Sequence, residues 1–69
     1  MKFHYHPETD SLYIGLLDKP GVDAQEVVPG VVLDFDGERR LVGIEIDNAS
    51  KVVNLSRVET EALPVIKVA

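Results

Sequence analysis

The sequence contains no cysteine and no long apolar run. The absence of cysteine excludes disulfide bonds and thiolate metal sites, two common ways of stabilising a small domain. A membrane-spanning helix needs about 20 consecutive apolar residues, and no segment approaches that length. With 69 residues, the chain lies near the lower size limit for independent folding. We therefore expect one domain over residues 1–69 that is stabilised by self-association.

Basic residues are also scarce. Seven lysines and arginines stand against twelve acidic residues, which leaves a formal net charge of -5. Such a protein is repelled by nucleic-acid phosphates and by anionic lipids, so the composition argues against nucleic-acid and membrane partners. The first residues lead into strand-like sequence rather than a signal peptide. We therefore expect a soluble, cytoplasmic protein.

Alternation of apolar and polar residues is clearest in Val31–Ile46, which predicts a β-hairpin around the turn sequence D-G-E-R at 36–39. A four-residue loop would place Leu33 opposite Val42. One face would then hold Val31, Leu33, Phe35, Val42, Ile44 and Ile46, and the other Val32, Asp34, Leu41, Gly43 and Glu45. A slip of one residue would mix these sets, so burial should determine the register.

A second hairpin is predicted over residues 2–17, with its turn at Pro7–Asp10. Pairing Tyr5 with Leu12 sorts the side chains cleanly between two faces. One face receives Phe3, Tyr5, Leu12, Ile14 and Leu16, and the other receives Lys2, His4, His6, Ser11, Tyr13 and Gly15. Gly15 within a strand suggests a bulge or a close approach by another backbone.

The rest of the chain gives weaker signals. Residues 24–28 could be a short edge strand or extended chain. A helical segment is expected over 48–63, with a capping box that begins at Ser56 and an end at Pro64. Residues 65–68 have strand composition and could pack on the same chain or on a neighbour. The predicted fold is α+β and mostly β: an antiparallel meander of about four strands, with the C-terminal helical segment packed on one face.

Several phrases carry a resemblance to a known family. They are Y-H-P-E-T-D at 5–10 with L-Y-I at 12–14, P-G-V-V-L-D at 29–34, and D-G at 36–37 with L-V-G-I-E-I at 41–46 and A-S at 49–50. Together they resemble the small prokaryotic proteins of the domain of unknown function 2283 family, over roughly residues 2–50. His6 replaces the acidic residue usual in that family, so no role of that acid is carried over. The resemblance implies a compact, mostly-β domain without an established activity; similar small proteins are sometimes regarded as antitoxin-like partners of a second small protein.

Two histidines form the one metal-site candidate. His4 and His6 emerge on the same side of a strand, where Asp10 or Tyr13 could join them around Zn²⁺ or Ni²⁺. A catalytic zinc site usually has three protein ligands, and two are well placed here. A solvent-facing polar strand explains the same pattern. A small metal-binding protein or enzyme that uses these histidines is the alternative to the function favoured below.

Catalytic patterns are otherwise lacking. In the predicted register Asp34 and Glu45 lie roughly 13 Å apart, too far for a glycosidase pair. Asp36 and Asp47 fit a turn and a helix cap. The sequence has neither a serine-nucleophile elbow nor a phosphate-binding loop, so we predict no catalytic residue and no cofactor.

Apolar residues on the outer face point to an interface. Tyr13, Leu17, Val32 and Leu41 would form an exposed patch unless the loop at 18–30 folds over them. Glu45 could bond to a partner, and Val65 and Ile66 could pair with a neighbour. The favoured function is therefore a non-enzymatic interaction module that forms homo-oligomers and can bind a second small protein.

Overall fold

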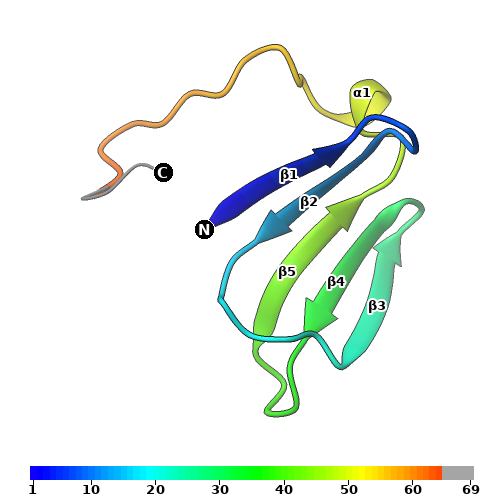
Figure 1. Cartoon of the computed structure of the whole chain (residues 1–69), viewed down its shortest axis with the longest axis vertical. Coiled ribbons are helices and arrows are strands. Elements are labelled where there is room, and N and C mark those ends of the chain that lie inside the picture. Colours follow the sequence, from blue (N-terminus) through cyan, green and yellow to red (C-terminus); the bar gives the residue numbers. More distant parts are fainter. Residues whose placement is uncertain (65–69) are drawn as a thin grey trace.

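A computed structural model describes residues 1–64, which form one antiparallel sheet and a short helix (Figure 1). The elements are β1 (Lys2–His6), β2 (Ser11–Gly15), β3 (Asp23–Val28), β4 (Val31–Phe35), β5 (Leu41–Ile46) and α1 (Ala49–Val52). The strand order is β1-β2-β5-β4-β3, so the β1–β2 hairpin adds to the β3–β4–β5 meander through β2 and β5. The predicted mostly-β antiparallel class is confirmed. The sheet has five strands because the segment left open at 24–28 pairs with β4.

The first hairpin has the predicted register, with Tyr5 opposite Leu12. The Thr9 N–H donates to the His6 carbonyl at 3.3 Å and closes the turn. Asp10 ends the turn with a φ of 53°, in the left-handed region. Aspartate reaches that region more easily than most residues because its short side chain can hydrogen-bond locally.

The predicted register of the second hairpin is wrong by two residues: Leu33 lies opposite Ile44, not Val42. One cause is the loop, which is longer than the predicted four residues and is closed by Asp36. Its Oδ1 accepts the backbone N–H groups of Glu38 and Arg40 at 2.8 and 2.9 Å, and its Oδ2 accepts the Arg40 Nε–H at 2.8 Å. These donors, the Arg40 N–H foremost, hold the pKa of Asp36 below its ordinary value.

The second cause is a β-bulge in β5. Asp34 lies opposite Gly43 while Phe35 lies opposite Leu41, which leaves Val42 as an extra residue. Val42 is completely buried there. Because the total shift is two, the residues of β4 keep their predicted faces. Leu41, predicted on the same face as Val32, lies opposite Phe35 instead.

The helix is much shorter than the predicted segment 48–63. It covers Ala49–Val52 and gives way at Val53 to extended backbone. Consecutive valines favour helix weakly. At the expected capping box, the Ser56 N–H and hydroxyl both donate to Asn54 Oδ1, which makes a local turn instead of a new helix. We call residues 53–63 the arm; residues 65–68 lie outside the described part of the chain.

The buried core is small. Leu12, Ile46 and Ala49 form its centre, and Ile14, Ile44 and Val53 pack against them. Since α1 has a single turn, it covers one end of the sheet rather than a whole face. Within residues 1–64, no helix is long and apolar enough to cross a membrane.

Candidate interaction site

Two rows of apolar side chains run across four strands. Residues directly opposite each other in antiparallel strands share a side of the sheet. The first row is Phe3, Ile14, Ile44 and Leu33, and the second is Tyr5, Leu12, Ile46 and Val31. We call these eight residues the apolar face. Of the eight, Leu12 and Ile46 are buried, whereas Phe3 and Tyr5 are 52% and 40% exposed.

An apolar groove lies where the apolar face meets the arm. It has a volume of about 460 Å³ and is lined by Phe3, Tyr5, Leu12, Ile14 and Ile46 from the sheet and by Val53, Asn54, Leu55 and Val58 from the arm. No charged side chain is among these nine lining residues. The groove therefore suits an apolar surface, and its lining offers no acid–base pair.

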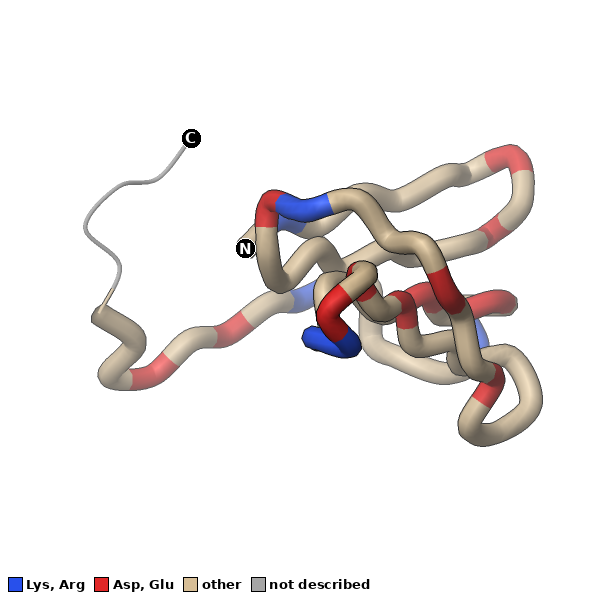
Figure 2. The backbone as a smooth tube through the Cα atoms, turned by 90° about the horizontal axis from the view of Figure 1, so that it is seen from below, with Lys and Arg blue, Asp and Glu red and all other residues tan. Residues whose placement is uncertain are grey.

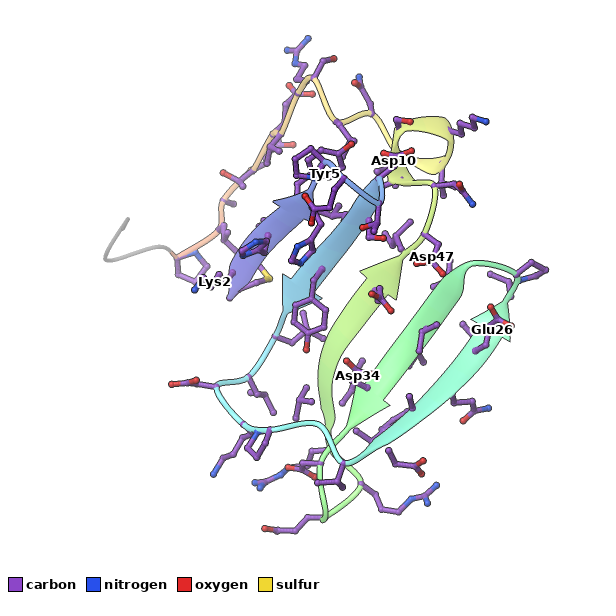
Figure 3. All side chains as sticks on the ribbon, turned by 45° about the vertical axis from the view of Figure 1, so that its right-hand side comes forward. Lys2, Tyr5, Asp10, Glu26, Asp34 and Asp47 are labelled. Carbon is purple, nitrogen blue, oxygen red and sulfur yellow. The ribbon has the colours of Figure 1, made fainter. Side chains whose placement is uncertain are left out.

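Asp10 ties this edge of the sheet to α1. Its carboxylate accepts hydrogen bonds from the Ser50 hydroxyl at 2.7 Å, the Ser50 N–H at 3.1 Å and the Tyr5 hydroxyl at 2.7 Å. Its carbonyl accepts the Ala49 N–H at 2.8 Å. We call this set the Asp10 clamp; Figure 3 labels Asp10 and Tyr5. The bonds from Ser50, then from Tyr5, lower the pKa of Asp10, and the same contact raises the pKa of Tyr5.

On the opposite face, Tyr13 lies on two glycines. Its ring covers Gly43 so closely that a Cβ there would overlap the hydroxyl and ring, and a Cβ on Gly15 would meet the ring edge at 3.6 Å. Burial raises the pKa of Tyr13, and the carboxylates of Asp34 and Glu45 raise it further. The nearest group to Gly15 is therefore an aromatic side chain and not the backbone that the sequence predicts.

The chain matches a family model described as a protein of unknown function (DUF2283) over residues 2–50. This range holds all five strands and the Asp10 clamp. The chain belongs to the DUF2283 family. No curated protein and no solved structure matches it. The resemblance found in the sequence is thus confirmed, and the DUF2283 description carries no activity.

The sequence segments that carry the DUF2283 resemblance contain residues that contact one another in the structure. Tyr5 and Asp10 from the first phrase hydrogen-bond to each other, and Asp10 binds Ser50 from the last one. Gly43, in the G-I-E-I phrase, provides the surface on which Tyr13 lies. The match ends at Ser50, so the arm lies beyond the matched DUF2283 region.

The two metal candidates of this DUF2283 chain lie side by side. The rings of His4 and His6 are stacked, with centroids 4.3 Å apart and planes inclined by 24°. Ring nitrogens direct their lone pairs within the ring plane, so nearly parallel stacked rings do not aim at one ion. In the described part of the chain, no three His, Asp or Glu side chains gather as a metal site. Asp10, one of the two residues considered as a further ligand, is bound by Ser50 and Tyr5 instead.

We expect Zn²⁺ and Ni²⁺ to leave the melting temperature of this DUF2283 chain unchanged, because the stacked histidines offer no converging set of ligands. Thermal unfolding with and without a molar excess of each metal measures this. A metal-dependent rise that disappears in a His4→Ala/His6→Ala variant would support the metal-binding alternative instead.

The predicted interface residues of the outer face do not form one patch. Tyr13 and Val32 are half-buried, Leu41 lies opposite Phe35, and Leu17 is 47% exposed in the loop after β2. Val65 and Ile66 lie outside the described residues. The sequence does not predict the groove, because the helical segment expected over 48–63 would include Leu55 and Val58 and pack on the sheet.

The separation predicted for Asp34 and Glu45 also changes with the register. Asp34 lies opposite Gly43 and Glu45 opposite Val32, so the two acids are diagonal neighbours on adjacent strands. Such neighbours have Cα atoms about 7–8 Å apart, instead of the 13 Å expected. Both carboxylates raise the pKa of the Tyr13 hydroxyl, and Glu45 lies directly opposite Tyr13.

Proposed function

We propose that this chain is a non-enzymatic interaction module of the cytoplasm that associates with itself and can bind a second small protein. The observation that carries this proposal is the apolar face, where two rows of side chains cross four strands with two of eight residues buried. A sheet with an apolar face needs a second layer over it. Contiguous exposed apolar surface of this kind is typical of interaction sites.

The antitoxin-like role suggested by the family resemblance would use the same surface. A second small protein that presents an apolar helix or sheet could take the place of a second copy. In that case the two partners would compete for the apolar face, and self-association would keep the face covered until the other protein is present.

Size-exclusion chromatography with light scattering tests the proposal. At micromolar concentration we expect the mass of a dimer or larger oligomer, and a Phe3→Ser variant should shift toward the monomer. Leu17→Ser is the control, because Leu17 and Phe3 have similar exposed fractions, 47% and 52%, but Leu17 is not part of the apolar face. Its mass should equal that of the wild type.

Two outcomes would contradict the proposal. A monomeric wild type over the whole micromolar range would exclude self-association. Dissociation by Leu17→Ser but not by Phe3→Ser would show that the interface lies elsewhere on the molecule.

A further inference from the structure

The arm is attached to its own sheet only near its start. Val53 packs on the core cluster. Beyond it, the hydrogen bonds of the arm within the described residues are local, from Ser56 to Asn54 and from Arg57 to Glu59. In Figure 1 the arm leaves α1 and runs past the outer side of β1, and in Figure 2 it extends away from the body of the sheet. The arm thus borders an open groove instead of closing it.

Two arm side chains turn toward this groove while remaining exposed. Leu55 and Val58 line it, yet they are 38% and 73% exposed. Phe3 on the facing side is 52% exposed as well. Apolar walls on both sides of an open groove indicate that an apolar surface fits between them.

The chain exposes more surface than a compact monomer of its size, as expected if a second copy covers part of it. The chain exposes 5653 Å², whereas a compact monomer of 7.6 kDa exposes about 4,300 Å². The projecting arm contributes to this excess, and an interface of standard size buries roughly 800 Å² of each partner. The radius of gyration, 12.9 Å, likewise exceeds the value of about 11 Å expected for 69 residues.

The distribution of charge also favours a second copy. A two-fold interface places a patch against itself, so a charged patch would repel its own image. The groove has no charged lining residue. Asp34 and Glu45 are near Tyr13 on the other face, and Figure 2 shows the acidic residues in several separate segments of the backbone. The net charge of -5 therefore does not oppose contact between two apolar faces.

Pairing of two copies through the edges of their sheets would not cover the apolar face. Joining β1 or β3 of two copies would lengthen the sheet and leave both apolar faces in water. The β3 edge carries the acids Asp23 and Glu26, and its ladder is irregular between Glu26 and Val28, so it is a poor edge for pairing. Stacking of the faces is the arrangement that covers them.

We infer that two copies stack their apolar faces and that the arm of each copy clamps the other, with Leu55 and Val58 closing over the partner seated in the groove. This inference rests on the proposed self-association and adds the surface and the segment that perform it. The arm lies beyond the residues that match the family model. The contact that the arm makes with the second copy would therefore be a property of this chain and not of the family.

Val58→Asp and Val22→Asp form a matched pair for the test. Both valines are largely exposed, 73% and 68%, so neither change should disturb the folded monomer. Val58 lines the groove and Val22 lies in the loop before β3. Sedimentation equilibrium should show a dissociation constant raised at least about tenfold by Val58→Asp, because the carboxylate would be buried against an apolar surface. Val22→Asp should match the wild type.

Each other outcome has a definite meaning. If the wild type is dimeric and Val58→Asp leaves its dissociation constant unchanged, the arm is not part of the interface, and this inference fails while the proposed function stands. Equal weakening by both variants would indicate a general effect of charge and would also overturn the inference. A monomeric wild type would overturn the proposed function itself.

Discussion

Replacing Gly43 with alanine is expected to lower the free energy of unfolding by about 2 kcal/mol, the range for inserting a methyl group into a well-packed site. The new Cβ would overlap the ring of Tyr13. Gly43 lies in the middle of the sheet, opposite Gly15 on one side and Asp34 on the other. Because both neighbouring strands hold this backbone in place, the ring must move, and part of its buried area returns to water.

Gly37→Ala is the control, since a Cβ at Gly37 meets nothing within 4 Å. Urea unfolding at one fixed protein concentration should give nearly the wild-type value for that variant. Adding Tyr13→Ala to Gly43→Ala should cost less than the sum of the two single changes, because the overlap is then absent. Equal stability of Gly43→Ala and Gly37→Ala would show that the ring does not need its place over Gly43.

The faces of most strand residues could be predicted from the sequence, whereas one register could not. Alternation of apolar and polar residues assigns the side chains of β1, β2 and β4 to a side of the sheet, and in the β1–β2 hairpin it also gives the correct partner for Tyr5. It misplaces Leu41, which lies opposite Phe35. In the β4–β5 hairpin, the hydrogen bonds of Asp36 enlarge the loop and Val42 forms a bulge. Each adds one residue, and a shift of two is invisible to a pattern with a period of two.

Contacts between distant segments could not be predicted from the sequence, for a different reason. Pairing of β2 with β5 joins segments about 30 residues apart, and no local pattern specifies it. The two glycines that this pairing brings together, Gly15 and Gly43, were the available signal for the place of Tyr13. The groove depends on an arm that is not helical. The Asn54 side chain favours this conformation because it accepts the hydrogen bonds of Ser56 in a local turn.

Asp10→Ala is expected to lower the melting temperature by roughly 5–10 °C, the range for loss of a helix cap in a domain of this size. The change removes the acceptor of three hydrogen bonds, two from Ser50 and one from Tyr5. Alanine is also strained at a φ of 53°. Asp10→Asn keeps an acceptor oxygen and tolerates this φ, so it should melt between the wild type and Asp10→Ala. If all three proteins melt together, α1 does not need the Asp10 clamp.

The pH dependence of the same difference isolates the charge of Asp10. Its pKa is lowered in the folded chain, chiefly by Ser50 and then by Tyr5. Such a group stabilises the fold above its ordinary pKa and loses this contribution as the pH falls through its lowered value. The gap in melting temperature between wild type and Asp10→Ala should therefore stay constant from pH 7 to about pH 5 and narrow below about pH 4. Asp36 titrates in both proteins and cancels, so an unchanged gap at about pH 2 would exclude a role for the Asp10 charge. Tyr5 lines the groove and is held by Asp10, so acid that protonates Asp10 should also weaken the proposed association of two copies.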